Sequence, residues 1–237
     1  MMHDTNYFCN EAKKLGVDLN EKQIQQFIQF YDMLIEKNKV MNLTAITDFD
    51  EVVEKHFLDS ISLIRKYPLN QTCKILDLGT GAGFPGIPLK IAFPEIQITL
   101  VDSLNKRVLF LQEVIDALGL SGIVAVHGRA EDLGRNPNYR EMFDLCVSRA
   151  VANLSSLSEY CIPFVKVGGY FISYKGGDCE EEVNQANSAF TKLGAKLSGL
   201  DSFSIGENSR SLVVIEKTHA TKKAYPRKAG TPTKDPL

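Results

Sequence analysis

The sequence contains no tryptophan and only five cysteines in 237 residues. The cysteines stand far apart, without a C-x-x-C pair; they are Cys9, Cys73, Cys146, Cys161 and Cys179. An odd number of widely spaced cysteines argues against both a disulfide framework and a zinc site. We therefore expect no bound metal.

Long hydrophobic runs are also missing. No uncharged apolar stretch reaches about 18 residues, the length that a membrane-spanning helix needs. The first residues, MMHDTNYFCNEAKK, are polar where a secretory signal would be basic and then apolar. Hydrophobic residues make up 44% and charged residues 24% of the chain, as in ordinary globular proteins. These features predict a cytoplasmic protein.

The net charge of −2 conceals an uneven distribution. Between residues 217 and 237 there are six basic residues and one acid, Asp235, which leaves 21 basic and 28 acidic residues elsewhere. The basic residues of this tail are Lys217, Lys222, Lys223, Arg227, Lys228 and Lys234. Such asymmetry favours a polyanionic partner, although a solvated basic terminus explains the charge equally well.

The first 70 residues are predicted to be helical. Asn20 is the expected cap of one helix and Asp48 of a second. Their apolar faces consist of Ile24, Phe27, Ile28, Tyr31, Leu34 and Ile35 in the first, and Val52, Val53, Phe57 and Ile61 in the second. The sequence NKVMNLTAIT between them is predicted to be a loop.

After Pro68, short β-branched runs alternate with helical segments. The expected strands are KILDL, IQITLVD, GIVAVHG, FDLCVSR, GGYFISYK and RSLVVIEK, and the expected helices include Leu104–Leu118 and Leu154–Val165. This alternation predicts a parallel sheet with helices on both faces. The last stretch, KKAYPRKAGTPTKDPL, has three prolines and is predicted to form neither helix nor central strand. We divide the chain into a helical extension (1–70), a cofactor-binding domain (71–220) and a basic tail (221–237).

The stretch ILDLGTGAGFPGIP, residues 75–88, places glycines directly after the first expected strand. In an open parallel sheet, ligands bind where such a strand turns into a helix. Gly79, Gly81 and Gly83 would let a ligand lie against the backbone there. The stretch also contains a G-x-G-x-x-G pattern ending at Gly86, which by itself is a weak indication of dinucleotide binding.

Two neighbouring residues argue against a dinucleotide. Asp77 precedes the glycines, and its carboxylate would repel a pyrophosphate but attract an ammonium or sulfonium group. Pro85 removes a backbone N–H from the first helical turn, where a phosphate would find its donors. The cofactor that this chemistry favours is S-adenosylmethionine, which carries an ammonium, a sulfonium and an adenosine but no phosphate.

Acidic residues after the next two strands complete the expected cofactor site. Asp102 ends TLVD and can accept hydrogen bonds from two ribose hydroxyls, although it could instead cap the helix beginning at Leu104. In HGRAED, Ala130, Glu131 and Asp132 are placed to meet the adenine edge. Taken singly, they could equally cap a helix.

The fourth strand ends in CVSRA, which brings Ser148, Arg149 and Ala150 to the same sheet edge. An arginine there can hold a phosphate or the O6/N7 edge of guanine; its alternative is a surface ion pair. Guanine N7 has an in-plane lone pair and no proton to lose, so its methylation needs positioning rather than a general base.

Two further features have functional and structural interpretations. His56 and Asp59, in KHFLDS, lie on one helical face, where such a pair is more often structural than catalytic. Lys175 follows the fifth strand in YKGG and could contact RNA phosphate or simply end the strand.

Together these motifs resemble the RsmG (GidB) family of small-subunit ribosomal RNA methyltransferases. The matching segments are NLTAI, HFLDS, DLGTGAGFPGIPL, TLVDS, GRAE, SRAV, KGG and YPRKAGTPTKDPL, nearly from end to end. The resemblance implies a class I methyltransferase fold, Rossmann-like and α/β, with a mostly parallel seven-stranded sheet and a helical N-terminal extension. It also implies methyl transfer from S-adenosylmethionine to N7 of one guanosine in 16S ribosomal RNA, in the loop beside the decoding centre.

The resemblance also assigns roles to individual residues. Cofactor contacts are implied for Gly79, Phe84, Ala130, Glu131 and Arg149, with the ring of Phe84 packing on the cofactor. For RNA, charge and placement favour three candidates, which are Lys175, Arg227 and Lys228.

Three alternatives remain open at this stage. The first is a nucleotide-binding oxidoreductase that uses Gly81, Gly83 and Gly86. The second is a non-enzymatic RNA- or ribosome-binding module that keeps a cofactor fold. The third is a methyltransferase acting on a small molecule, against which the basic tail and helical extension argue.

Overall fold

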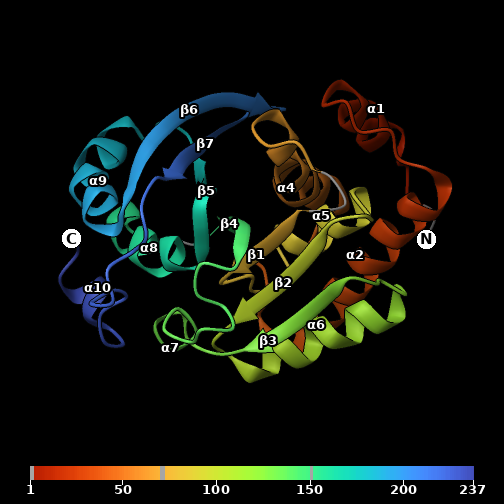
Figure 1. The fold of residues 1–237 in the computed structure, drawn as a ribbon. Helices are drawn as coiled ribbons and strands as arrows, with labels where there is room; N and C mark the ends of the chain where they lie inside the picture. The colour runs from red at the N-terminus through yellow and green to blue at the C-terminus, as the bar shows by residue number, and fades with distance from the viewer. Residues whose placement is uncertain (1–2, 70–72, 150–151) are drawn as a thin grey trace.

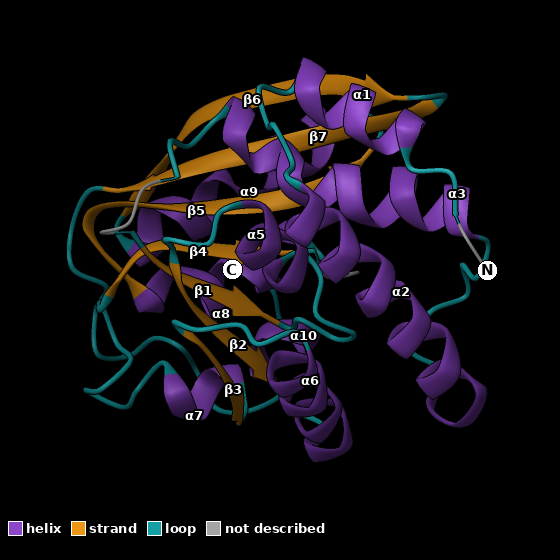
Figure 2. Cartoon of the chain, turned by 90° about the vertical axis from the view of Figure 1, so that its right-hand side faces the viewer, coloured by secondary structure: helices purple, strands orange, loops and turns teal. Residues whose placement is uncertain are grey.

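The computed structural model describes residues 3–69, 73–149 and 152–237 (Figure 1). The predicted boundary between residues 70 and 71 and the site residue Ala150 lie outside these ranges. Seven strands form one sheet in the order β3-β2-β1-β4-β5-β7-β6, with β7 antiparallel to its two neighbours. The strands are β1 Lys74–Leu78, β2 Gln97–Asp102, β3 Ile123–His127, β4 Phe143–Ser148, β5 Val165–Gly176, β6 Ala195–Ile205 and β7 Asn208–Lys217. Figure 2 shows the twisted sheet, with β3 at one edge and β6 at the other.

Helices cover both faces of this sheet, as Figure 1 shows. One face carries α1 Asn6–Lys14, α2 Glu21–Met41, α5 Gly86–Ala92 and α6 Asn105–Ala117, and the other carries α8 Leu154–Cys161 and α9 Glu180–Leu193. Neighbouring strand residues therefore enter different cores: Ile75 packs with the first group and Leu76 with the second. A parallel strand that is buried on both faces carries apolar residues on both sides, as Ile75, Leu76 and Leu78 do in β1, where Asp77 is the buried exception.

The second predicted helix of the extension is a single helical stretch with a π-helical turn inside it. It begins at α3 Phe49–Val52, passes through the π-helix η1 Val53–Leu58 and α4 Asp59–Ile61, and ends as the 3₁₀ turn η2 Ser62–Arg65. Asp48 caps its start by accepting from the Glu51 amide, as predicted. The expected apolar face is fully buried.

The helical extension shares its core with the sheet. The ring centroid of Phe30 on α2 lies 5.3 Å from that of Phe84, which follows the glycines. The ring centroids of Phe27 and Phe57 lie 4.9 Å apart. Asn20 caps α2 as predicted, and the structure shows a capping box there, because Asn20 and Gln23 exchange hydrogen bonds between side chain and backbone. The extension therefore forms a wall on the sheet rather than a core of its own, and the proposed division at residue 70 stays a prediction.

Three local expectations were wrong. Helix α2 continues to Met41, so the first part of NKVMNLTAIT is helical. Strand β6 was not expected, because a half-exposed edge strand with polar residues lacks the apolar run of a buried one. The proline-rich tail contains the one-turn helix α10 Thr231–Lys234, in which Pro232 occupies the first turn, where its missing N–H is no loss.

Membrane-spanning helices and metal-binding clusters were looked for in the described residues. Within residues 3–69, 73–149 and 152–237, every helix is too short or too polar to cross a bilayer. The same ranges contain no cluster of three or more side chains suited to a metal ion.

Candidate functional site

A cavity of about 390 Å³ opens at the carboxyl ends of β1, β2 and β4. We call it the strand-edge cavity. Its lining consists of Leu78, Gly79, Val101, Asp102, Ser103, Gly128, Arg129, Ala130, Glu131, Ser148, Ala152, Leu157 and Tyr160. Its volume lies within the range of roughly 300–1,000 Å³ that is typical of small-molecule sites. Four residues predicted to hold a cofactor are in this lining, namely Gly79, Asp102, Ala130 and Glu131.

The glycine loop shapes the floor of this cavity through its backbone. Gly79, Gly81 and Gly83 have φ values of +72°, +60° and +103°, which side chains rarely adopt. At Gly83 a Cβ atom would also lie 2.6 Å from Cγ1 of Ile87. Gly79 lines the cavity, whereas Gly81 and Gly83 serve the turn that places it.

Asp77 lies beneath the glycine loop and does not line the cavity. Its Oδ2 accepts hydrogen bonds from Thr80 Oγ1 at 2.6 Å and from the Gly86 amide at 2.8 Å. The carboxyl is fully buried, and this burial raises its pKa from 3.8 to about 7. Within the described ranges its Oδ1 has no hydrogen-bond partner. Asp77 therefore braces the loop, and its attraction for a cationic cofactor stays a prediction.

Asp102 combines the two roles that its position allowed. Its Oδ2 accepts from the Gly81 amide at 3.0 Å and its Oδ1 from the Leu104 amide at 2.8 Å, which holds the start of α6. Arg107 lies 3.4 Å from the same carboxylate. Asp102 also lines the strand-edge cavity, so it is placed for ribose hydroxyls as well.

The opposite side of the cavity comes from two helices. Ala130 and Glu131 begin α7 Ala130–Leu133, and Tyr160 lies on α8. Glu131 is nearly buried, and its Oε1 accepts a hydrogen bond from the Gly230 amide at 3.0 Å.

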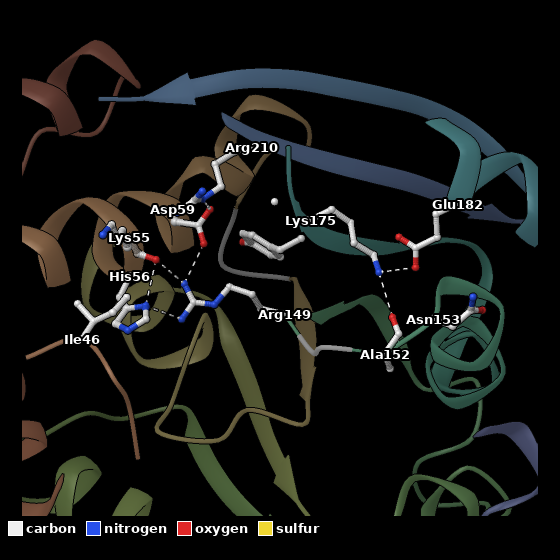
Figure 3. A pocket seen from close by; sticks show the side chains of 12 residues that line it. Ile46, Lys55, His56, Asp59, Arg149, Ala152, Asn153, Lys175, Glu182 and Arg210 are labelled. Carbon is white, nitrogen blue, oxygen red and sulfur yellow. Dashed lines mark hydrogen bonds and ion pairs between the residues drawn. The ribbon is translucent and has the colours of Figure 1, made fainter. Parts of the chain in front are cut away.

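A second cavity, of about 630 Å³, lies next to the first and is shown in Figure 3. We call it the charged cavity. It is lined by Ile46, Lys55, His56, Asp59, Arg149, Ala152, Asn153, Tyr174, Lys175, Gly176, Glu182 and Arg210. Ala152 belongs to the lining of both cavities, so the two meet there.

Two arginines converge on one buried carboxylate in the charged cavity (Figure 3). Arg149 donates to Asp59 at 2.8 Å, and Arg210 donates to its other oxygen at 3.1 Å. Arg149 also donates to the Lys55 carbonyl at 3.1 Å. The guanidinium of Arg149 is thus fixed in the wall of the charged cavity, and it is absent from the strand-edge lining.

His56 completes this cluster as a neutral ring. Its Nδ1 lies 3.1 Å from Arg149 Nη2, and its Nε2 lies 3.1 Å from Thr44 Oγ1. Burial, followed by the positive charge of Arg149, lowers the pKa of His56 from 6.5 to about 3. Because the ring is uncharged near neutral pH, its Nδ1 can either accept a hydrogen bond from the guanidinium or donate one to the Lys55 carbonyl oxygen, which lies 3.0 Å away.

Phe84 packs against His56 and Arg149 on the side that faces away from the charged cavity. Its ring stacks on His56 at 4.5 Å between centroids, and the Arg149 guanidinium lies 5.0 Å from its centre. Phe84 is nearly buried and lines neither cavity. It supports the residues that line the charged cavity, and its implied contact with the cofactor stays a prediction.

Lys175 lies on the far side of the charged cavity from Arg149, as Figure 3 shows. Its Nζ donates to Glu182 at 2.8 Å and to the Ala152 carbonyl at 3.1 Å. Glu182 also accepts from the Leu154 amide at the start of α8. The lysine therefore holds the chain at the junction of the two cavities, and contact with RNA stays a prediction.

The basic tail is docked rather than free. Arg227 is held by the fully buried Glu159, and Lys217 pairs with Glu141 at 3.0 Å in the interior. Two of the six cations between residues 217 and 237, Arg227 in the tail and Lys217 at the end of β7, are thus committed to internal pairs, which reduces the charge available to a polyanion. Lys228 is exposed and remains a candidate for RNA contact.

Sequence reasoning missed several residues of the charged cavity. His56 and Asp59 were noted as a pair but given no role, although the HFLDS motif could have drawn attention to them. Lys55 begins the segment KHFLDS and Arg210 begins the expected strand RSLVVIEK, but neither residue was given a role.

Comparison with known proteins gives a consistent result. The family model described as "GidB: rRNA small subunit methyltransferase G" matches residues 23–213. A ribosomal RNA small subunit methyltransferase G from Lachnoclostridium phytofermentans is 52% identical over 100% of this chain and 98% of its own length. The protein of the same name from Alkaliphilus metalliredigens is 50% identical over 95% of each chain.

Solved structures that are more distant in sequence share the fold. The M. jannaschii TYW2 structure in complex with AdoMet superimposes with a TM-score of 0.56 at 15% identity, over 73% of this chain and 79% of that one. TrmN from Thermus thermophilus gives a TM-score of 0.53 at 17% identity, over 70% of this chain and 53% of that one. At these identities the likeness supports the class I methyltransferase fold, which agrees with the seven-stranded sheet.

Proposed function

The chain belongs to the family of rRNA small subunit methyltransferase G, and from that membership we propose that it methylates N7 of a guanosine in 16S ribosomal RNA. It is an S-adenosylmethionine-dependent methyltransferase that acts on ribosomal RNA, which rules out the oxidoreductase and the non-enzymatic module. The observation that carries the proposal is the junction of two different cavities at Ala152. We place the reaction in the cytoplasm.

The strand-edge cavity suits S-adenosylmethionine. Asp102 offers a carboxylate for ribose hydroxyls, and Gly79 offers a bare backbone for close approach. The buried carboxyl of Asp77, whose Oδ1 has no hydrogen-bond partner within the described part of the chain, lies beneath the glycine loop. When bound, this cofactor supplies an electrophilic methyl group on a sulfonium.

The charged cavity suits the guanosine and its phosphates. Its volume of about 630 Å³ accommodates a nucleotide, and Lys55, Arg149 and Arg210 contribute positive charge to its lining. Cations in such a cleft attract the RNA backbone, since phosphate contacts dominate RNA affinity. Asp59 keeps both guanidiniums in fixed positions, so a base entering the cavity meets a rigid wall.

This arrangement supports catalysis by positioning. Guanine N7 attacks with its lone pair, so no side chain has to remove a proton from it. His56 is neutral, and its Nδ1 lies between Arg149 and the Lys55 carbonyl oxygen, which places the ring to orient the arginine rather than to transfer a proton. Holding nucleophile and methyl group in line can supply much of the rate enhancement.

The test is methylation with S-adenosylmethionine labelled in its methyl group, offered separately to unmethylated 30S subunits and to bare 16S RNA. We expect label in 7-methylguanosine after digestion to nucleosides. Arg149→Ala should reduce it by about 100-fold, because the wall of the charged cavity loses its central cation. Arg65→Ala, which removes an arginine paired with Asp201 at a distance from both cavities, is the matched control.

Label in a different nucleoside, or equal activity of Arg149→Ala and wild type, would contradict the proposal. Comparing the two substrates also shows which form of the RNA is recognised. The affinity for S-adenosylmethionine should stay within about threefold in Arg149→Ala, since the arginine lines only the charged cavity.

A further inference from the structure

The last seventeen residues of the chain lie across the two helices that wall the strand-edge cavity. We call residues 221–237 the C-terminal strap. In Figure 1 its helix α10 lies beside α8, and α7 is close by. Arg140 donates to the carbonyls of Thr221 and Tyr225, and Arg135 donates to that of Pro226. The strap thus follows a defined path on the surface.

One ion pair anchors the strap to α8. The backbone N–H of Arg227 donates to Glu159 at 2.6 Å, and its guanidinium donates to both oxygens of the same carboxylate at 2.7–3.0 Å. Glu159 is fully buried. A buried carboxylate is expensive unless it is fully satisfied, so this contact fixes the strap on α8. Asp235, also in the strap, forms a second ion pair with Arg227, with its Oδ2 at 3.1 Å from Nη1.

Beyond this anchor, the strap contacts two residues that line the strand-edge cavity. The Gly230 amide donates to Glu131 on α7 at 3.0 Å. The hydroxyls of Thr233 and Tyr160, which lies on α8, share a hydrogen bond of 2.8 Å. Ser156, one turn before Tyr160, donates to the Pro232 carbonyl at 2.7 Å. A segment of four residues therefore connects the two helices that form this side of the cavity.

We propose that the C-terminal strap is a positioning element for the cofactor site, in which Arg227 acts through Glu159 and the segment from Gly230 to Thr233 acts through Glu131 and Tyr160. The strap holds α7 and α8 at the spacing that the adenosine end of the cofactor requires. The inference rests on the proposed function, because it takes the strand-edge cavity as the S-adenosylmethionine site. It gives Arg227 a role at the cofactor site instead of a direct contact with RNA.

The geometry distinguishes this role from simple stabilisation of the fold. A strap that only stabilised the fold would have no need to contact the cavity lining, whereas this one bonds to a lining residue from each helix. Ordering the wall before binding lowers the entropic cost of binding. Changes in the strap should therefore appear in cofactor affinity and in the KM for the cofactor.

The experiment measures the affinity of the full chain for S-adenosylmethionine by titration calorimetry without RNA. Arg227→Ala should raise Kd by about tenfold and Arg227→Lys by less, since lysine keeps the charge but loses the two-pronged contact. Thr233→Val removes one hydroxyl at an exposed position and should raise Kd by about threefold. Lys223→Ala, an exposed lysine of the same strap, removes the same charge and should leave Kd unchanged.

Steady-state kinetics give the second readout. The KM for S-adenosylmethionine should rise with Kd, while kcat at saturating cofactor and the KM for RNA stay near wild type in Thr233→Val. A lower melting temperature combined with wild-type Kd and KM in the folded variants would overturn the proposal. If Arg227→Ala fails to fold, Arg227→Lys and Thr233→Val decide the question by the same criterion.

The two proposals fail in different ways. If the wild-type chain does not bind S-adenosylmethionine, the proposed function is wrong. If the wild type binds and methylates but every folded strap variant binds equally well, only the role of the strap is wrong.

Discussion

The strand-edge cavity takes its form from backbone turns, whereas the charged cavity takes its form from side chains that come from distant parts of the chain. In the first, Gly79 directly follows β1, and Asp102 is the last residue of the adjacent strand β2. In the second, Asp59 comes from the helical extension, Arg149 from the end of β4 and Arg210 from β7. The lining of the strand-edge cavity can thus be predicted from the ends of the strands, whereas that of the charged cavity depends on how helices pack over the sheet.

The two cavities should therefore respond to different kinds of substitution. Changes of charge should damage the charged cavity and leave the strand-edge cavity intact. Added side-chain bulk in the glycine loop should disturb the strand-edge cavity first. Four predictions test this contrast, beginning with the largest effect.

Asp59→Asn should lower kcat/KM for RNA methylation by about 100-fold. The substitution removes the charge that Arg149 and Arg210 share, and losing one partner of a buried ion pair is worth roughly 3–5 kcal/mol. The affinity for S-adenosylmethionine should change by less than about threefold. Labelled-methyl transfer and calorimetric titration measure the two quantities.

Asp201→Asn is the matched control for this substitution. Asp201 also lies between two cations, at 2.8 Å from Arg65 and 3.2 Å from Lys66, but it lines neither cavity. Its replacement should leave methylation near wild type. Equal losses of cofactor affinity and methylation in Asp59→Asn would show that the two cavities are not separable.

Gly83→Ala should lower the free energy of unfolding by about 2–3 kcal/mol, more than Gly81→Ala at about 1 kcal/mol. Both glycines have positive φ values, but only at Gly83 would the new methyl collide with Ile87. At Gly81 the closest atom is the Gly79 carbonyl oxygen at 4.0 Å. Urea unfolding of both variants measures the difference, and equal losses would refute the steric explanation.

Lowering the pH should destabilise the charged region through His56. Its pKa is about 3 in the fold and 6.5 when unfolded, so the unfolded chain takes up the proton first. Stability is therefore lost as pH falls from 6.5 towards 3, by about 1.4 kcal/mol at one unit below 6.5. Urea unfolding should show that the free energy of unfolding of wild type falls by this amount, relative to that of His56→Gln, between pH 7.5 and 5.5. If the difference between the two proteins stays the same over this range, the lowered pKa of His56 is wrong.

The strand-edge side should respond to pH in the opposite direction. Asp77 has a pKa of about 7 in the fold and 3.8 when unfolded, so the folded state keeps the proton longer. Its burial costs stability progressively as pH rises from about 4 to about 7. Asp77→Asn should remove that slope, which the same unfolding series detects.

Much of the fold could be predicted because its signals are local. The expected strands KILDL and FDLCVSR correspond closely to β1 and β4, and Asn20 caps α2 as its sequence indicates. Alternation of β-branched runs with amphipathic segments is sufficient to give a parallel sheet. Strand β6 escaped because an exposed edge strand is half polar and has no buried run.

The candidate site was only partly predictable for a related reason. Gly79, Asp102, Ala130 and Glu131 follow strands at short distances, so topology alone brings them to one edge. The destinations of side chains were harder to foresee. Phe84 and Arg227 lie close to motifs of the expected site, yet the first packs behind the charged cavity and the second pairs with a buried glutamate.

The sequence by itself determined which residues lie at the carboxyl-end edge of the sheet, because each strand and the turn after it are encoded in neighbouring residues. Only the tertiary structure decided what surrounds that edge. It brought Asp59 between Arg149 and Arg210, more than 50 residues away in sequence from either, and it docked the basic tail through Glu159. Buried charges must find partners wherever the packed chain supplies them, and no local pattern records which partner that is.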